Sequence, residues 1–160
     1  MQITDIETCD LADVLDLNEA SVPHVSSLTA GELAWFADNA HYFRVVRDET
    51  GVAGFLVGLR PGLPYRSLNY RWFSDNYDDF GYVDRVAVDA RARRKGIASL
   101  LYDDFARTLS GKVEVMTCEV NLRPSNESSM RYHARHDFVQ VGRQQTEGGT
   151  KEVALMEKKL

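Results

Sequence analysis

The spacing of hydrophobic positions changes several times along the chain, and the first forty residues predict a short strand followed by two helices. Residues 2–7 favour the strand. Apolar positions then recur at helical spacing after Asp10, which is expected to cap a helix running to about Asn18. Thr29 is expected to begin the second helix, because Glu32 stands three residues later and completes a capping-box sequence.

The pattern then becomes typical of strands. Residues 41–47 and 52–59 are rich in Val, Phe and Leu and are separated by a polar segment that ends in glycine, so they predict a hairpin. A Gly- and Pro-containing turn at 60–64 ends the second of these strands, and residues 80–88 predict another strand.

In the second half of the chain, strands alternate with helices. Apolar positions recur every four residues from Ile97 to Leu109, which predicts a helix that ends at Gly111. The order mixes hairpins with crossovers, so we expect one α+β domain over residues 1–160, with a central twisted mixed β-sheet of about seven strands flanked by about four helices. The remaining predicted elements are a strand over 113–120, a helix over 124–136, and strands over 138–141 and 152–156.

Composition and charge narrow the classes of function. The chain has 160 residues, of which 44% are hydrophobic and 27% charged, as in ordinary globular domains. Its net charge of −5 argues against a nucleic-acid partner and is compatible with a cationic substrate. No apolar run approaches the ~18 residues that span a bilayer, and residues 1–7 lack the pattern of a signal peptide.

The cysteines and histidines do not suggest a metal centre. Cys9 and Cys118 form neither a disulfide framework nor a metal quartet, and His24 and His41 have no ligand-like spacing with them. We therefore expect a cytoplasmic protein with no metal, no membrane partner and no nucleic-acid partner.

The segment most suggestive of chemistry joins the 80–88 strand to the next helix. A basic run over 93–95 is followed by Gly96 and Ala98, which leave the backbone at the helix start accessible. N–H groups at a helix start, the helix dipole and nearby cations together favour an anion such as a phosphate. The glycines fit neither a P-loop nor a dinucleotide fingerprint, and spacing alone equally allows a solvated basic turn.

This segment resembles a motif of the GNAT superfamily of N-acetyltransferases. The run Arg93-x-x-Gly96-x-Ala98 is similar to Gln/Arg-x-x-Gly-x-Gly/Ala, whose backbone holds the acetyl-CoA pyrophosphate in that family. The preceding run Val86-Ala87-Val88 occupies the strand that pairs with the pantetheine arm in the family.

A second segment, from Asn126 to Phe138, resembles the family's Asn-x-x-Ala/Ser-x-x-φ-Tyr/His-x-x-φ-Gly-Phe run. His133 stands where a tyrosine general acid is most often found, as in the phosphinothricin-acetyltransferase-like branch. Tyr132 stands one position earlier, where the family usually buries an apolar residue. Asp137 replaces the glycine before the phenylalanine, and Asp tolerates the left-handed conformation expected there better than most residues.

The resemblance implies the GNAT fold, acetyl-CoA (coenzyme A) as the cofactor, and acyltransferase activity. It assigns residues of the strand, the basic turn and the second motif to cofactor binding. They are Val86, Ala87, Val88, Arg93, Arg94, Lys95, Gly96, Ile97, Ala98, Asn126, Ser129, Tyr132 and His133.

Acetyl transfer to an amine needs a base, because an alkyl amine with a pKa of ~10 is mostly protonated at neutral pH. Glu119 is the first candidate, and the pair Glu119-Val120 resembles the strand end of ribosomal-protein N-terminal acetyltransferases. Asp84 is the second, and His133 is the candidate that protonates the leaving thiolate. Each has a structural alternative: an ion pair for Glu119, a pair with Arg85 for Asp84, and a hydrogen bond or packing for His133.

The acceptor is expected to meet the stretch from Tyr65 to Tyr82, which we interpret as a long aromatic loop. Aromatic rings interleaved with carboxylates suit a cationic amine through cation–π and Coulomb attraction. The alternative is that the rings pack on the core or on a second copy of the chain, which would make a homodimer. The predicted substrate-binding residues are Trp72, Asp75, Tyr77, Asp78 and Asp79.

The sequence thus predicts an acetyl-CoA-dependent N-acetyltransferase that moves an acetyl group directly to a primary amine of a small molecule or peptide. The alternative is a catalytically silent acyl-CoA-binding regulatory module of the same fold. A nucleic-acid module that uses the basic turn fits the acidic net charge poorly.

Overall fold

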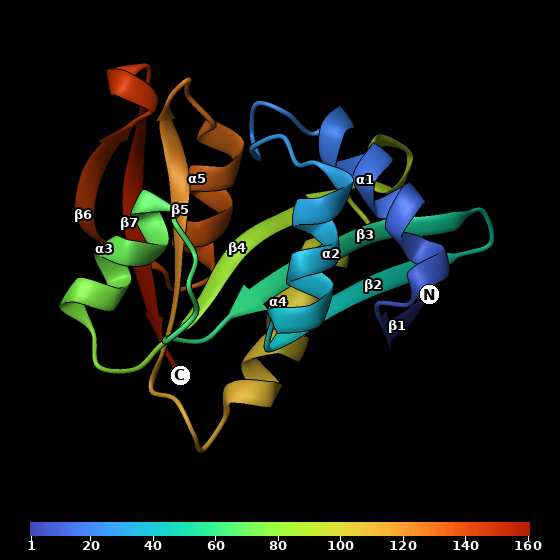
Figure 1. The fold of residues 1–160 in the computed structure, drawn as a ribbon, viewed down its shortest axis with the longest axis horizontal. Helices are drawn as coiled ribbons and strands as arrows, with labels where there is room; N and C mark the ends of the chain where they lie inside the picture. Colours follow the sequence, from blue (N-terminus) through green and yellow to red (C-terminus); the bar gives the residue numbers. More distant parts are fainter. The chain divides into compact units, whose positions relative to one another are not determined.

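A computed structural model describes all residues, 1–160, and its seven strands form one sheet in the order β1-β2-β3-β4-β5-β7-β6 (Figure 1). β4 and β5 run parallel, while β1–β2, β2–β3, β5–β7 and β6–β7 pair antiparallel, so the predicted mixed sheet is confirmed. The strands are β1 (Gln2–Asp5), β2 (Tyr42–Asp48), β3 (Gly51–Leu59), β4 (Gly81–Val88), β5 (Val115–Arg123), β6 (Val139–Thr146) and β7 (Lys151–Lys159).

Five α-helices and three short 3-10 helices connect the strands. No helix has both the length and the apolar character needed to cross a membrane. The helices are α1 (Leu11–Ala20), α2 (Ala30–Asn39), α3 (Leu68–Asn76), α4 (Ile97–Leu109) and α5 (Glu127–Arg135), with the 3-10 helices η1 (Thr8–Asp10), η2 (Ala90–Ala92) and η3 (Glu147–Gly149).

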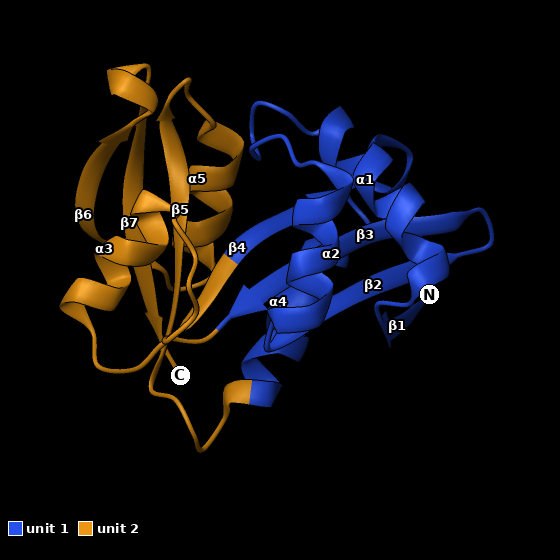
Figure 2. Cartoon of the chain, in the orientation of Figure 1, with its two compact units in different colours: residues 1–59, 84–108 blue, residues 60–83, 109–160 orange.

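The chain divides into two compact units, each built from two segments (Figure 2). Unit 1 contains residues 1–59 and 84–108, and unit 2 contains residues 60–83 and 109–160. β4 therefore begins in unit 2 and ends in unit 1, and the last residue of α4 belongs to unit 2.

In unit 1, helices cover both faces of the β1-β2-β3 sheet. Gly54 and Gly58 lie on the face toward α4, where a Cβ at Gly58 would lie 2.5 Å from the Phe105 ring. Close helix packing therefore requires glycine at Gly58. Successive strand residues point to opposite faces, so the buried residues that alternate with these glycines, such as Phe55 and Val57, point to the other face of β3, which also contacts α1.

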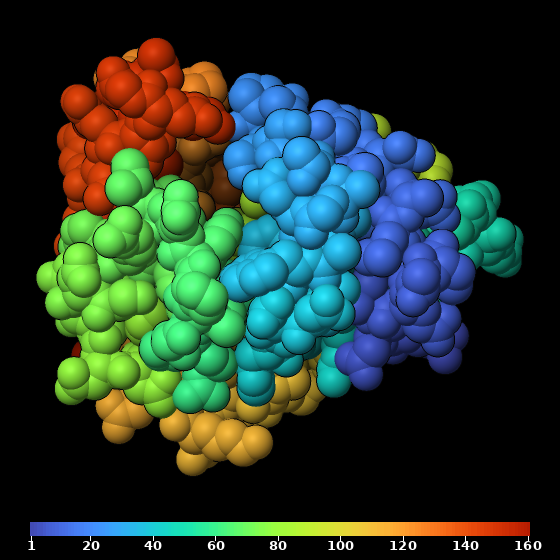
Figure 3. All heavy atoms as spheres, in the orientation of Figure 1, coloured from blue at the N-terminus to red at the C-terminus, as the bar shows by residue number.

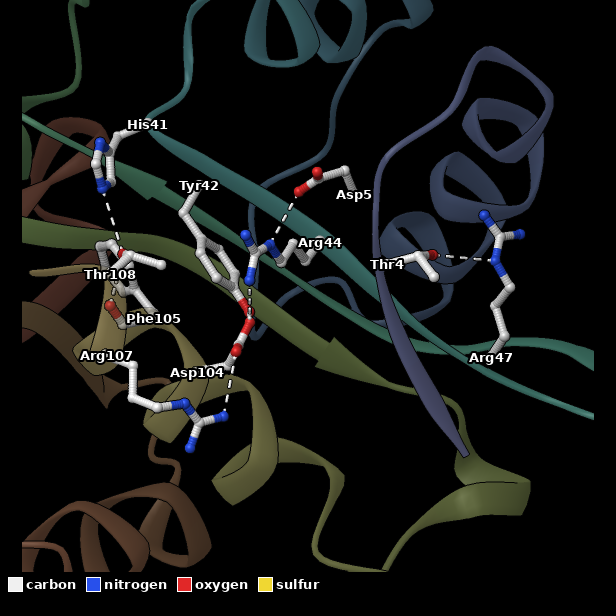
Figure 4. A network of polar contacts seen from close by, with 10 residues as sticks. All are labelled: Thr4, Asp5, His41, Tyr42, Arg44, Arg47, Asp104, Phe105, Arg107 and Thr108. Carbon is white, nitrogen blue, oxygen red and sulfur yellow. Dashed lines mark hydrogen bonds and ion pairs between the residues drawn. The ribbon is translucent and has the colours of Figure 1, made fainter.

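A polar network fixes α4 to β1 and β2 (Figure 4). The Asp104 carboxylate on α4 accepts hydrogen bonds from the Tyr42 hydroxyl at 2.8 Å, from Arg44 at 2.7 Å and from Arg107 at 3.2 Å. Arg44 also donates to Asp5 on β1 at 2.9 Å. One half-buried carboxylate thus connects three elements of unit 1.

In unit 2, α3 lies against one face of the β5-β7-β6 sheet. The Trp72 ring packs where Gly142 has no side chain, since a Cβ there would lie 2.8 Å from it. The Tyr77 hydroxyl just after α3 donates a 2.5 Å hydrogen bond to Glu157 on β7. These contacts explain why the predicted aromatic loop is wrong: its middle part, Leu68–Asn76, forms α3, which is capped by the Ser67 hydroxyl that accepts from the Tyr70 N–H.

The helix-capping predictions have different outcomes. The Thr29–Glu32 capping box is confirmed, with hydrogen bonds of 2.9 and 3.1 Å. Asp137 adopts the expected left-handed conformation with φ of 69°. Asp10 stands at the N-cap position of α1, as predicted, but its side chain makes no capping hydrogen bond, because the carboxylate instead accepts from the Arg47 guanidinium and from the Glu7 N–H.

Candidate active site

The predicted phosphate-binding turn, residues 93–96, lies in unit 1 between η2 and α4. All four of its residues are exposed, and the backbone takes left-handed conformations at Arg94 (φ 66°) and Gly96 (φ 74°). The position at Gly96 faces open space, since a Cβ built there meets no atom within 4 Å. Arg93 before them is extended (φ −64°, ψ 154°), so the backbone changes conformation several times within the few residues before α4 begins.

The turn suits a pyrophosphate in three respects. Its backbone N–H groups precede the positive end of the α4 dipole, its cations are exposed, and nothing fills the space beside Gly96. Buried Ile97 anchors the start of α4 below the turn. On the strand before it, Val86 and Val88 are half-buried and Ala87 is buried, while Ala98 is half-buried at the helix start.

Asp84, the second base candidate, forms a buried ion pair with its neighbour. Its carboxylate accepts from the Arg85 guanidinium at 2.8 Å, and both side chains are only 3% exposed. Arg85 also donates to the Asn18 side chain at 2.9 Å and to the Ser26 carbonyl at 2.8 Å, and its guanidinium lies over the Phe36 ring. These contacts favour the structural alternative for Asp84, because Arg85 connects β4 to the segment between α1 and α2.

Glu119, the first base candidate, is held by a tyrosine that sequence reasoning did not single out. The Tyr82 hydroxyl donates to Oε2 of Glu119 at 2.7 Å, and the Tyr82 side chain is fully buried whereas Glu119 is half-buried. The Tyr82 ring packs among Tyr70 and Phe73 of α3, with ring centroids 5.7 and 5.8 Å away. The carboxylate is therefore fixed at one oxygen by a rigid donor.

Strand register explains how Tyr82 and Glu119 meet. Tyr82 pairs with Thr117 across the parallel β4–β5 ladder, and Glu119 lies two residues beyond Thr117 on the same face. Leu155 and Glu157 pair with Glu119 and Thr117 on β7, so this is also the face that carries α3. The alternation of strand residues could have predicted the shared face, but only with the register known.

His133 on α5 belongs to the opposite face of this sheet. Its ring contacts Phe138 at 5.1 Å, and Lys158 of β7 lies over Phe138. Lys158 alternates with Glu157, so it points away from the face of Glu119. The two catalytic candidates therefore lie on opposite faces.

The protonation of His133 follows from its contacts. Nδ1 lies 2.7 Å from the Ser129 carbonyl oxygen and 3.2 Å from the Ser129 hydroxyl; the carbonyl oxygen only accepts, so the shorter contact is a hydrogen bond when Nδ1 carries the proton. Burial lowers the pKa of His133, the hydrogen bond to Ser129 opposes this shift, and the nearby His136 adds to it. In the neutral form favoured by burial, a ring with its proton on Nδ1 has its lone pair at Nε2; the role of His133 toward the thiolate stays a prediction.

The other predicted residues of the second motif shape α5. The Asn126 side chain caps the helix by accepting from the Ser129 N–H at 3.3 Å. Tyr132 is half-buried and stacks on His136, with ring centroids 4.3 Å apart. These contacts explain the local sequence of α5, and a role in cofactor binding stays a prediction.

The five predicted acceptor-binding residues differ in their surroundings. Trp72 packs on Gly142, Tyr77 binds Glu157, and Asp79 accepts from Arg60 at 2.9 and 3.1 Å. Asp75 and Asp78 are exposed at the end of α3 and in the loop after it. Asp79 is exposed as well, so all three carboxylates of the set face solvent, and Asp79 does so while paired with Arg60.

The remaining candidate groups have structural surroundings. Cys118 is buried, and burial raises the pKa of its thiol, which disfavours a nucleophilic role. Potential ligand atoms of Glu7, Cys9 and Asp10 lie within 4.8 Å of one another. Both oxygens of Asp10 accept from Arg47, whose positive charge disfavours a cation there.

Comparison with known proteins identifies the family. The model of the acetyltransferase (GNAT) family matches residues 10–138, so the chain belongs to the GNAT family. Over 122 residues it is 31% identical to L-2,4-diaminobutyric acid acetyltransferase of Streptomyces coelicolor, a match that covers 75% of this chain. That match covers 58% of the relative, so the chain spans less than two thirds of its length.

Solved structures share the fold at low identity. Arabidopsis thaliana NAA60, in complex with a bisubstrate analogue, superposes with a TM-score of 0.79 at 18% identity, covering 99% of this chain and 97% of that one. Ribosomal-protein-alanine N-acetyltransferase of Brucella melitensis gives a TM-score of 0.74 at 19% identity, covering 100% of both chains. These structures confirm the predicted GNAT fold, while the branch within the family stays a prediction.

Proposed function

We propose that the chain is an N-acetyltransferase that moves an acetyl group directly from acetyl-CoA to a primary amine. Acetyl-CoA supplies the acetyl group as a thioester. The observation that carries the proposal is the hydrogen bond from buried Tyr82 to half-buried Glu119, which orients a carboxylate that the surface can still reach. Family membership supports the reaction class.

The 93–96 turn would hold the pyrophosphate of the cofactor. Its N–H groups and the α4 dipole offer positive potential, while Arg93, Arg94 and Lys95 are exposed beside them. Side chains of β4, including half-buried Val86 and Val88, would flank the pantetheine arm.

Glu119 would act on the acceptor. An alkyl ammonium must lose a proton before its nitrogen can attack, and a positioned carboxylate can take that proton directly or through a water molecule. The Tyr82 hydroxyl engages Oε2 and fixes the orientation of the carboxylate. As the carbon–nitrogen bond forms and the carbon–sulfur bond breaks, Glu119 holds the first amine proton, and the second proton of the attacking nitrogen passes to the departing thiolate, directly or through water.

For the acceptor we propose a small aliphatic amine with a second charged group, in the class of the diamino acids. The name of the Streptomyces relative, a diaminobutyric acid acetyltransferase, motivates this choice. The exposed carboxylates Asp75 and Asp78 and the net charge of −5 favour a cationic acceptor.

The test is an acceptor screen with acetyl-CoA, read as thiol release and as a mass increase of the acceptor. The panel contains L-2,4-diaminobutyrate, its longer diamino acid homologues, simple alkyl amines and peptides with free N-termini. We expect acetylation of a diamino acid. Acetylation of peptides alone would overturn the acceptor class, and CoA binding without any thiol release would support the silent acyl-CoA-binding alternative.

A further inference from the structure

The phosphate-binding turn is connected to the β2–β3 hairpin by an arginine that lies just before it. Arg91 in η2 donates to Oδ2 of Asp48, the last residue of β2, at 2.6 Å, and to the Val52 carbonyl in β3 at 3.3 Å. The hairpin tip projects at the edge of unit 1 and is coloured teal in Figure 3. The ion pair therefore joins two segments that are about forty residues apart in the sequence.

Asp48 is itself held in place by the hairpin. Its Oδ1 accepts hydrogen bonds from the N–H and the hydroxyl of Thr50, both at 2.9 Å. The hydrogen bond from Arg91, followed by those from Thr50, holds the pKa of Asp48 well below its usual range. Asp48 therefore offers Arg91 a fixed, ionised acceptor.

The start of β3 also supports both ends of the turn. At the η2 end, the Asp89 N–H donates to the Ala53 carbonyl at 2.8 Å, and the Asp89 side chain accepts from the Arg91 N–H at 3.0 Å. At the α4 end, a Cβ at Gly54 would lie 2.8 Å from the Ile97 side chain. The hairpin and the first residues of β3 thus form the base on which the turn is built.

Arg91 differs in this respect from the other cations of the segment. Arg93, Arg94 and Lys95 are exposed on the turn itself, whereas the guanidinium of Arg91 is directed to Asp48 and Val52. A guanidinium with its donors on a carboxylate and a carbonyl is poorly placed to bind a phosphate as well.

We propose that Asp48 and Arg91 are positioning residues for coenzyme A: their ion pair holds the 93–96 turn in its phosphate-binding shape, and Arg91 does not bind the phosphate itself. This inference rests on the proposed function, because it takes the turn to be the cofactor site. It assigns a role in cofactor affinity to a hairpin turn that carries no cofactor-binding motif.

The direction in which Asp48→Asn changes the affinity for CoA separates this proposal from direct phosphate binding by Arg91. Asp48→Asn removes a negative charge near an anion site, and by charge alone it would strengthen CoA binding. It would also release Arg91 to bind the phosphate. If the ion pair positions the turn, Asp48→Asn instead weakens CoA binding, against the electrostatic trend.

The experiment measures CoA affinity by calorimetry for the wild type, Asp48→Asn, Arg91→Met and the double variant. We expect each single variant to weaken binding roughly fivefold and the double variant to be no weaker than either, as for two residues that act through one contact. Asp38→Asn, an exposed carboxylate on α2, makes the same charge change and should leave CoA affinity unchanged. The exchange of both residues, Asp48→Arg with Arg91→Asp, should recover part of the affinity.

Steady-state kinetics supplies a second measurement that general destabilisation would not reproduce. The KM for acetyl-CoA should rise in both single variants, while kcat and the KM of the acceptor stay near their wild-type values. If the wild type binds CoA and Asp48→Asn binds it equally or more tightly, the inference about the ion pair is overturned while the proposed function still stands. Absence of CoA binding by the wild type would overturn the proposed function, and the inference with it.

Discussion

The Tyr82 hydroxyl lies 2.7 Å from Oε2 of Glu119 and joins β4 to β5 by a side-chain hydrogen bond. The tyrosine is fully buried and its ring packs against Tyr70 and Phe73 of α3, whereas the carboxylate is half-buried. A similar pair lies on the same face, where Tyr77 donates to Glu157 at 2.5 Å. Matched substitutions in the Tyr82–Glu119 and Tyr77–Glu157 pairs can therefore be compared: a catalytic role lowers kcat, whereas a structural role lowers only stability.

Glu119→Gln is expected to lower kcat by ~10²–10⁴-fold, the usual size of a general-base contribution, with a small effect on the KM for acetyl-CoA. The amide keeps the shape of the side chain but cannot take the amine proton. The rate should recover at high pH, where the free amine is abundant. The measurement is a pH–rate profile of thiol release.

Glu157→Gln is the control for that experiment, because it changes a tyrosine-bound glutamate on the same sheet face. We expect its kcat to stay near the wild-type value. Full activity of Glu119→Gln would show that Glu119 is not the base.

Tyr82→Phe is expected to reduce kcat by roughly tenfold and the free energy of unfolding by about 1 kcal/mol, because it removes one buried hydroxyl and its hydrogen bond. Tyr77→Phe removes the matching hydroxyl and should lower stability by a similar amount with no loss of kcat. Urea unfolding and steady-state rates check both variants. Equal losses of kcat in the two would contradict a specific role for Tyr82.

Asp84→Asn is expected to lower the free energy of unfolding by about 3 kcal/mol, because it leaves the Arg85 guanidinium buried without its carboxylate. The folded variant should keep its kcat. Asp79→Asn breaks the more exposed pair with Arg60 and should lower the free energy of unfolding by at most about 1 kcal/mol. A stable but inactive Asp84→Asn protein would instead identify Asp84 as the base.

Stability is expected to fall as the pH drops below the ordinary pKa of histidine, ~6.5, in part because of His133. Burial lowers the pKa of His133 in the folded state, so the unfolded chain binds more protons there and gains from acidification. One such group contributes a slope of at most about 1.4 kcal/mol per pH unit. Urea unfolding at pH 5 and 7 should show a smaller difference for His133→Phe than for the wild type.

His24→Phe controls for the loss of an imidazole, because His24 is exposed. Its stability should change between pH 5 and 7 as much as that of the wild type. An unchanged difference in His133→Phe would contradict the role assigned to burial.

Several elements could be predicted because the interactions that define them are local. The Thr29–Glu32 capping box and the left-handed Asp137 depend on residues within a few positions of one another. The turn with Gly96 could be located in the same way, because a short run of neighbouring residues defines it, and its phosphate-binding role stays a prediction. Helix α3 was missed because the aromatic residues in and just after it pack on or bind residues far away in the sequence, such as Gly142 and Glu157.

The sequence by itself determined the family, most of the order of helices and strands along the chain and the position of the turn at residues 93–96, since periodicity and short motifs encode them. Only the tertiary structure decided what surrounds each candidate carboxylate. Glu119 and Asp84 both lie near the sequence motifs, so the sequence left both as base candidates. In the structure, strand register places Tyr82 beside Glu119, whereas Asp84 is buried in an ion pair with Arg85. Contacts between residues far apart in the chain depend on strand pairing, which local sequence does not specify.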